Sequence, residues 1–356
     1  MITVYIGSTT GYSGKSLVAL GLALRMKADG YRVGYMKPYG KVPVVEQGKL
    51  IDGDVLFMKD ILGLGEPVED LCPVVHSHDL LVEMMKGKGK DLSRKVLKAY
   101  KAVSRDKDVV ILGGARDIYD GSVLGISGVR LAGELGAKVV IVDPFTGEVC
   151  LDCLMAMKEI FGAGLVGAVI NRVPPEGMKY LKDMASPFLK RKGIPLLGIL
   201  PSDRVLNAVT IRQINNALGG VVLCCEERLD DLVENFSIGA MDVESAMKYF
   251  RRTPNKAVIT GGHRTDIQLA ALETSTRCLV LTGDLLPNAL ILSKAKISGV
   301  PVITVKHDTL TTVEKIESML GKARIREDKK VERAIELMDD NFDYNGFYKS
   351  IGLKKR

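Results

Sequence analysis

Gly7-Ser8-Thr9-Thr10-Gly11-Tyr12-Ser13-Gly14-Lys15-Ser16 is the stretch that decides the fold of this chain, because it joins an apolar run at 2–7 to an amphipathic run at 15–30. The first run has the length of a buried strand, and the second has the period of a helix. A glycine-rich turn between them leaves backbone N–H groups able to surround a phosphate. In such a loop Gly14 permits close approach, Lys15 reaches the phosphate oxygens and Ser16 holds magnesium.

The loop departs from the usual G-x-x-x-x-G-K-[ST] spacing, since Thr9 stands where the first glycine belongs. The alternative is a glycine turn that opens a helix beside a surface lysine. The position of the loop at the first strand-to-helix turn favours phosphate binding. We therefore predict that one continuous segment binds a nucleotide, namely Thr10, Gly11, Tyr12, Ser13, Gly14, Lys15, Ser16 and Leu17.

Short apolar runs alternate with amphipathic stretches along the rest of the first half. They lie at 32–38, 108–114, 138–144 and 165–173. Strands covered on both faces are apolar throughout, so this rhythm predicts an α/β fold with a parallel sheet of the P-loop NTPase type and helices on both faces.

A second series of apolar runs begins at residue 221, after a pause in the pattern, and is long enough for a compact α/β unit. We therefore predict a nucleotide-binding domain at 1–205 and a smaller α/β domain at 206–325. A C-terminal helix with a loosely attached basic tail is expected at 326–356.

The composition of the 356 residues excludes several classes of protein. Hydrophobic residues make up 46% and charged residues 26%, enough to bury one large or two medium cores. No run approaches 18 uninterrupted apolar residues, and the N-terminus is a strand, so we expect a cytoplasmic protein without a membrane partner. The net charge is +7, but aromatic residues are only 5% and tryptophan is absent, which argues against a nucleic-acid partner.

Histidine and cysteine spacing does not predict a metal site. Cys150 and Cys153 form a single C-x-x-C, and His76 and His78 lie two residues apart without a third ligand. We interpret these side chains as buried thiols and solvated histidines.

Four motifs together resemble the dethiobiotin synthetase-like group of P-loop proteins. They are the loop at 8–16, Lys37-Pro38, the acidic segment at 51–64 and Asn171-Arg172. The group includes the relatives that make cobyrinic acid a,c-diamide and the N-terminal domain of long phosphotransacetylases. This last resemblance covers nearly the whole chain, because 257–283 looks like a DRTGG domain. The acetyltransferase domain would follow Arg356, so phosphate acetyltransfer is not expected as a reaction of this chain.

The resemblance implies ATP and Mg²⁺ as cofactors and assigns roles to single residues. Lys15 and Lys37 would be catalytic, with Lys37 near the γ-phosphate and an acidic substrate. Ser16 and Asp54 would bind magnesium, and Asp52 is a weaker substitute. The alternative for both carboxylates is a helix N-cap with a first-turn acid.

The same resemblance places the base of the nucleotide. Asn171 would recognise adenine, with Arg172 in the same site, and the loop that begins at Pro201 would lie against the base. An asparagine at a strand end is alternatively only a turn residue. One position departs from the family, because Gly113 and Gly114 end the strand where dethiobiotin synthetase has a magnesium-binding Glu. The glycines suit close backbone approach better than catalysis.

The second half offers one candidate ligand site. Gly261, Gly262, His263 and Arg264 lie between a strand and a helix and would suit a small anionic ligand. The alternative is a glycine turn with Asp266 capping the helix.

Two functions follow from these expectations. The first is an ATP- and magnesium-binding regulatory or accessory protein related to the N-terminal region of phosphotransacetylase. The alternative is an ATP-dependent ligase of the dethiobiotin synthetase or cobyrinic acid a,c-diamide synthase type, which activates a carboxylate. A scaffold that keeps a P-loop without using it is a third class. Resemblance also implies a homodimer.

Overall fold

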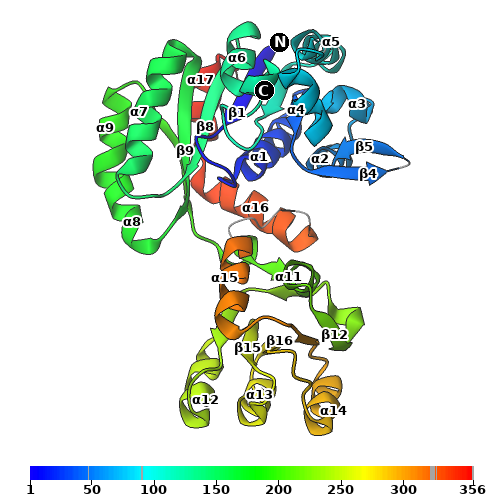
Figure 1. Cartoon of the computed structure of the whole chain (residues 1–356). Helices are drawn as coiled ribbons and strands as arrows, with labels where there is room; N and C mark the ends of the chain where they lie inside the picture. Colours follow the sequence, from blue (N-terminus) through cyan, green and yellow to red (C-terminus); the bar gives the residue numbers. More distant parts are fainter. Residues whose placement is uncertain (47, 90, 321–324, 326, 355–356) are drawn as a thin grey trace. The chain divides into compact units, whose positions relative to one another are not determined.

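The computed structural model describes residues 1–46, 48–89, 91–320, 325 and 327–354, and the chain divides into two compact units (Figure 1). The first unit comprises Met1–Ser202 with Ile325–Arg356, and the second comprises Asp203–Arg324. Lys355 and Arg356, which end the predicted basic tail, lie outside the described residues.

A parallel sheet forms the centre of the first unit, with strand order β10-β9-β8-β1-β7-β2. Consecutive residues of the inner strands are buried, so both faces of the sheet are covered. This confirms the predicted α/β fold. The strands are β1 (Ile2–Gly7), β2 (Val33–Met36), β7 (Val109–Gly113), β8 (Lys138–Pro144), β9 (Leu165–Val173) and β10 (Leu196–Pro201).

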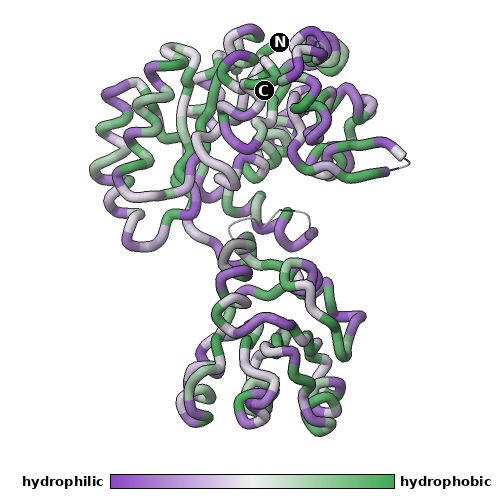
Figure 2. The backbone as a smooth tube through the Cα atoms, viewed as in Figure 1, coloured by the Kyte–Doolittle hydropathy of each residue, from purple (hydrophilic) through white to green (hydrophobic). Residues whose placement is uncertain are grey.

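Helices pack around this sheet, and Figure 2 shows their turns alternating between hydrophobic and hydrophilic residues. They are α1 (Lys15–Ala28), α2 (Gly53–Leu62), α3 (Val68–Leu71), α4 (His78–Met85), α5 (Leu92–Val103), α6 (Gly128–Glu134), α7 (Val149–Phe161), α8 (Pro175–Tyr180) and α9 (Ser186–Arg191). Small strand pairs lie between β2 and α4, formed by β3 (Tyr39–Gly40) with β6 (Val74–Val75) and by β4 (Pro43–Glu46) with β5 (Lys49–Asp52). The apolar-run pattern did not predict these short strands.

The C-terminal segment packs tightly on the first unit, which differs from the expectation of a loose tail. Helix α16 (Asp328–Asn341) lies on α1 and β10, and α17 (Tyr344–Ile351) lies on β9 and β10. Met338, Phe347 and Tyr348 are buried there. The reason is an apolar face that recurs at helical spacing in a segment whose charged residues dominate its composition.

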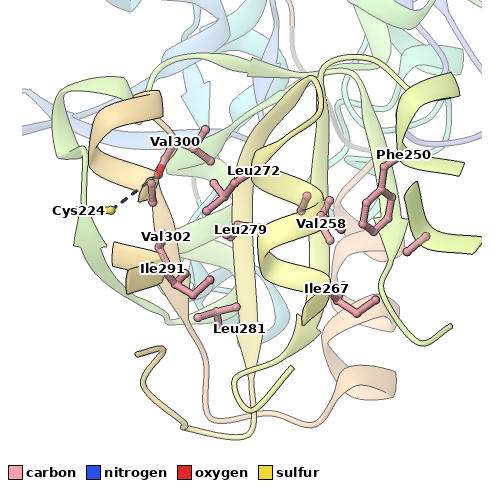
Figure 3. Close-up of a cluster of buried hydrophobic side chains, with 14 residues drawn as sticks. Cys224, Phe250, Val258, Ile267, Leu272, Leu279, Leu281, Ile291, Val300 and Val302 are labelled. Carbon is pink, nitrogen blue, oxygen red and sulfur yellow. Dashed lines mark hydrogen bonds between the residues drawn. The ribbon is translucent and has the colours of Figure 1, made fainter. Parts of the chain in front are cut away.

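The second unit contains a sheet of order β12-β17-β16-β15-β14, in which β12 is the antiparallel edge strand. One layer of helices packs on one face around Phe250, Ile267 and Ile291, as Figure 3 shows. The other face packs against helices that contribute Ile211, Ile214 and Ile316. This unit is therefore also a three-layer α/β arrangement.

The elements of the second unit follow the predicted runs, with β14 in addition. Its main strands are β12 (Val221–Cys224), β14 (Asn235–Ile238), β15 (Lys256–Gly261), β16 (Thr276–Thr282) and β17 (Val302–Thr304), and β11 (Val209–Thr210) pairs with β13 (Leu232–Val233). Its helices are α10 (Arg204–Asn207), α11 (Ile211–Leu218), α12 (Val243–Arg252), α13 (Thr265–Leu272), α14 (Ala289–Ser298) and α15 (Thr309–Leu320).

Candidate functional site

The glycine loop leads from the carboxyl end of β1 into an uncapped helix. Gly14 has a φ of 100°, in the left-handed region that favours glycine, and no side chain caps α1 there. The N–H groups of Lys15 and Ser16 in the first turn have no intrahelical acceptor. The buried Ser13 hydroxyl also has no hydrogen-bond partner among the described residues. The loop therefore presents several unsatisfied donors and the positive end of a helix dipole.

The Lys15 ammonium lies at this loop and donates hydrogen bonds to two neutral acceptors. It donates to Ser8 Oγ at 2.6 Å and to the carbonyl oxygen of Arg116 at 2.8 Å. Burial lowers the pKa of Lys15 to about 8, and the carboxylate of Asp143 opposes part of this shift. A phosphate oxygen would be a charged acceptor and would form a stronger bond with the ammonium than either neutral oxygen does.

Asp143, at the end of β8, holds the start of the loop. One carboxylate oxygen accepts a hydrogen bond from the Thr9 N–H at 2.8 Å, and the other accepts from the Thr9 hydroxyl at 2.7 Å. Burial raises the pKa of Asp143, while the Thr9 bonds oppose the shift. The sequence prediction missed this residue. An acid at the end of a buried apolar run, in KVVIVDP, was the signal that could have revealed it.

Asn171, at the end of β9, holds the other end of the loop. Its amide donates to the Ser13 carbonyl oxygen at 2.9 Å, and its own oxygen accepts from the Arg172 N–H at 2.8 Å. A Cβ at Gly14 would lie only 2.1 Å from the Asn171 amide nitrogen, so glycine is required there. That Asn171 recognises adenine, with Arg172 in the same site, stays a prediction. Burial lowers the pKa of the Arg172 guanidinium. Pro201 pairs with Val173 of β9 after a register shift in β10.

The predicted Lys37 and its two carboxylates form a buried ionic cluster. Lys37 Nζ donates to Asp54 at 2.8 Å and to both oxygens of Asp52 at 3.1 and 3.3 Å. Burial alone would lower the pKa of Lys37, but the two carboxylates raise it. Asp52 also accepts from the N–H groups of Asp54 and Val55, so it is the N-cap of α2. The N-cap interpretation therefore holds for Asp52, and Asp54 is the first-turn acid.

The two glycines at the end of β7 are places of close approach. A Cβ at Gly113 would lie 2.6 Å from the Tyr35 hydroxyl, and one at Gly114 would lie 2.8 Å from the Ile6 carbonyl oxygen. A glutamate at 113 would therefore require the buried Tyr35 ring to move. The next acids along the chain are Asp117 and Asp120, whose charges raise the pKa of Lys15 and so lie near the loop.

A turn at 116–120 contacts both Lys15 and Lys41. The Arg116 N–H donates to Asp120 at 3.3 Å, and Lys41 donates to the same carboxylate at 3.4 Å. His76 Nδ1 and the Tyr39 hydroxyl share a hydrogen bond of 2.7 Å. Burial and the charge of Lys41 lower the pKa of His76, so we expect it to be neutral at pH 7.

The second predicted site is a loop that is held from within. Gly262 approaches the Leu285 backbone so closely that a Cβ would lie 2.5 Å from its carbonyl oxygen. Arg264 donates to both oxygens of Asp266 at 3.0 Å and to the Met241 carbonyl oxygen at 2.9 Å. No side chain caps α13, so Asp266 pairs with Arg264 instead of capping the helix.

Beneath this loop, Gln268 is fully buried and donates to the carbonyl oxygens of Gly261 and Gly262 at 3.0 Å. These bonds fix the turn that carries His263. Across the described ranges of the chain, no group of three or more His, Cys, Asp or Glu side chains could hold a metal ion. Within the same ranges, no helix has the length and apolar character needed to cross a membrane.

Two family models match the chain in succession. The model described as "AAA domain" matches residues 2–210, and the model described as "DRTGG domain" matches residues 213–319. The first covers more than half of the chain, and together they follow its division into two units.

Curated relatives match nearly the whole chain at low identity. The phosphate acetyltransferase of Nitratidesulfovibrio vulgaris is 25% identical over 96% of this chain and 50% of the relative. That of Pseudomonas aeruginosa is 24% identical over 100% of this chain and 53% of the relative. The chain therefore spans about half the length of the curated relatives that it matches.

Solved structures resemble parts of the chain. MinD of Pyrococcus horikoshii, complexed with Mg-ADP, has a TM-score of 0.33 and 18% identity over 58% of this chain and 83% of that chain. Cobyrinic acid a,c-diamide synthase of Mycobacterium smegmatis has a TM-score of 0.32 and 16% identity over 57% and 86%. The CBS and DRTGG domains of Clostridium perfringens pyrophosphatase, complexed with diadenosine tetraphosphate, have a TM-score of 0.30 and 21% identity over 49% and 86%.

Proposed function

Since the chain belongs to the AAA domain family, we propose that its first unit binds ATP with magnesium and that the chain is a nucleotide-dependent regulatory or accessory protein. The observation that carries this proposal is the loop ahead of α1. Gly14 is left-handed and α1 has no side-chain cap, so N–H groups at its start lack acceptors. The Ser13 hydroxyl also lacks a partner among the described residues. An anion bound here would accept hydrogen bonds from these donors. Lys15 stands beside them and supplies the charge.

The residues present fit a nucleotide with magnesium. Lys15 would hold the β- and γ-phosphates, and Ser16, exposed at the start of α1, would offer its hydroxyl to magnesium. Asp54 would add a carboxylate oxygen. Lys37 lies close enough to lower the pKa of Lys15, so it would stand near the terminal phosphate. The bound magnesium would neutralise phosphate charge.

The base would lie toward the ends of β9 and β10. Asn171 and Arg172 lie near the end of β9, Pro201 ends β10, and the two strands are parallel neighbours. The backbone of this edge, together with these side chains, would select adenine. Thr10, Gly11, Tyr12 and Leu17 would complete the contact with the phosphates.

A regulatory role is preferred to a catalytic one because of the packing at Gly113. The end of β7, which would face the terminal phosphate, has no carboxylate, and a Cβ at Gly113 would lie 2.6 Å from the Tyr35 hydroxyl. Fewer hard ligands would hold the metal, so nucleotide would bind while phosphoryl transfer stays slow. The competing function is an ATP-dependent ligase that activates a carboxylate, and the buried Lys37 favours it.

The second unit would respond to a small anionic ligand at Gly261, Gly262, His263 and Arg264. An anion would have to replace Asp266 as the partner of Arg264. The chain would act as a homodimer. The chain matches about half the length of each curated phosphate acetyltransferase, which supports a relation to the N-terminal region of those enzymes. We propose no acetyltransferase activity for this chain.

The test is direct binding of ATP with magnesium by calorimetry. Wild type should bind, Lys15→Ala should lose at least about tenfold in affinity, and the control Lys101→Ala, an exposed lysine of α5, should match wild type. Equal and negligible binding by wild type and Lys15→Ala would end the proposal.

A second assay separates the two functions. Slow ATP hydrolysis that no added carboxylate stimulates is expected of a regulatory protein. Trapping of an acyl phosphate by hydroxylamine, in the presence of a small dicarboxylate panel, would instead identify a ligase.

A further inference from the structure

We propose that Asp143 and Asn171 are positioning residues that clamp the phosphate loop at its two ends and so hold it in the shape that receives phosphate. This inference rests on the proposed nucleotide site. It gives Asn171 a role apart from the base and gives Asp143 a role for the first time.

At the start of the loop, Thr9 stands in place of the usual glycine, and Asp143 holds it by hydrogen bonds. Thr9 occupies the position of the first glycine in the usual spacing. Both its N–H and its hydroxyl bond to the Asp143 carboxylate, at 2.8 and 2.7 Å. Two bonds to one buried carboxylate fix the backbone and the side chain of Thr9 together.

The clamp at the end of the loop acts on the residue before left-handed Gly14. The Asn171 amide donates to the Ser13 carbonyl oxygen at 2.9 Å and lies directly over Gly14. Its oxygen is taken by the Arg172 N–H, which sets the direction of the amide. The Ser13 carbonyl oxygen is thereby held by Asn171, while the N–H groups at the start of α1 stay unsatisfied.

The two clamps are spaced by the sheet. Strands β8 and β9 are parallel neighbours, and Pro144, which follows Asp143, pairs with Asn171 in register. The distance between the clamps is therefore set by rigid backbone and not by the loop. A loop held in this way is already ordered in the folded protein. Phosphate binding then does not have to supply the entropy cost of ordering it, so affinity is higher.

A probe without a base distinguishes the two roles of Asn171. Inorganic tripolyphosphate with magnesium can occupy the phosphate loop but cannot contact a base site. We expect Asn171→Ala to weaken tripolyphosphate about tenfold and to weaken ATP by at least the same factor, because the clamp acts on both ligands and base recognition would act on ATP alone. Asn341→Ala, which removes a similar amide-to-carbonyl bond within α16, should leave both affinities unchanged. Loss of ATP affinity alone would show base recognition and overturn the clamp at Asn171.

A double-variant cycle tests the clamp at Asp143. Asp143→Asn and Thr9→Val should each weaken tripolyphosphate about tenfold, and the double variant should be little worse than either one. The ³¹P resonance of the bound central phosphate should move in both single variants, which a purely structural loss of stability would not produce. Asp108→Asn is the control, because Asp108 precedes β7 at the amino ends of the strands, away from the loop at their carboxyl ends.

Two results would overturn the proposal. One is multiplicative losses in the cycle, since they would mean that Thr9 and Asp143 act independently. The other is wild-type affinity in all clamp variants. If wild type itself binds neither probe, the proposed function fails together with the clamp, whereas wild-type binding with unaffected variants rejects the clamp alone.

Discussion

At position 113, the neighbouring Tyr35 side chain restricts which residues can be accommodated. The Tyr35 hydroxyl occupies the space in which a Cβ at Gly113 would stand, at 2.6 Å, and Tyr35 is itself buried. Gly113→Ala should lower the free energy of unfolding by about 1–3 kcal/mol, because the ring must shift in a close-packed core. Urea unfolding of the purified variant measures this loss.

Removing the obstacle should reverse most of that loss. In Tyr35→Phe the hydroxyl is absent, so Tyr35→Phe/Gly113→Ala should be more stable than Gly113→Ala alone. An alanine that is tolerated at 113 without change in stability would contradict the packing argument and reopen the position to a carboxylate.

Lys256 is buried, and no carboxylate of the described residues forms an ion pair with it. It donates to the Thr274 hydroxyl at 2.8 Å and the Ser275 carbonyl oxygen at 3.1 Å, and burial lowers its pKa from 10.5 to about 8. Between these two values the unfolded chain binds more protons, so stability should rise with pH across that window. Below about pH 8 the full cost of burying the charge is present.

Lys256→Met should therefore raise the free energy of unfolding at pH 7, by about 1–3 kcal/mol, and should abolish the rise above pH 8. Denaturant unfolding of the second unit at pH 7 and pH 10 is the measurement. Lys248→Met removes an exposed lysine paired with Glu244 in the same unit and should change neither value appreciably. A destabilised Lys256→Met variant would show that the polar contacts outweigh the buried charge.

The start of α2 joins a helix cap to the candidate metal site. Asp52 caps the helix and pairs with Lys37, whereas Asp54 pairs with Lys37 without capping. Asp52→Ala should cost about 3–5 kcal/mol, since it removes a cap and one counter-charge of a buried lysine. Asp54→Ala should cost less stability but should raise the magnesium concentration needed for ATP binding.

Thermal unfolding measures the stability of both variants, and ATP affinity measured at increasing magnesium concentrations gives their magnesium requirement. A magnesium requirement that is unchanged in Asp54→Ala would mean that this carboxylate serves Lys37 alone and that the metal is held by phosphate and Ser16.

Sequence patterns predicted the elements whose own residues are mostly apolar. The strands at 2–7, 109–113, 138–144 and 165–173 are apolar along most of their length, so their place in a parallel sheet was predictable. The short strands β3 to β6 and the edge strand β14 carry too few apolar residues to stand out. Helix α16 is amphipathic but highly charged, and its packing on α1 depends on tertiary contacts that no local pattern contains.

The candidate site was predictable to the same degree. Gly14, Lys15 and Ser16 follow a local spacing rule, and the structure places them at the start of α1 as predicted. Asp143 lies 134 residues from Thr9 along the chain, so only the strand order could bring the two together. The close approach of Tyr35 to Gly113 depends on register in the same way.

At the scale of the whole molecule, the first unit is built from two chain segments with the second unit inserted between them. The sheet comes from Met1–Ser202, and the helices α16 and α17 that cover it come from Ile325–Arg356. Gly21 of α1 touches Met338, and Tyr348 donates to Asp29 at 2.6 Å. Helix α1 thus carries the phosphate loop at one end and the C-terminal helices along its side.

Chain removal after residue 324 should therefore unfold the first unit and spare the second. Loss of α16 and α17 exposes the sheet and removes the buried Leu337, Met338, Phe347, Tyr348 and Ile351. At about 1.5–3 kcal/mol for each side chain, the loss is comparable to the whole stability of a typical domain, about 5–15 kcal/mol.

Calorimetry on three proteins checks this expectation. The full chain should show the transitions of both units, residues 203–324 alone should melt cooperatively, and residues 1–324 should keep only that transition and should not bind ATP. A first-unit transition that survives in residues 1–324 would mean that the covering helices are dispensable. If instead residues 203–324 fail to fold alone, the second unit needs the rest of the chain for its stability, and the expectation for residues 1–324 fails with it.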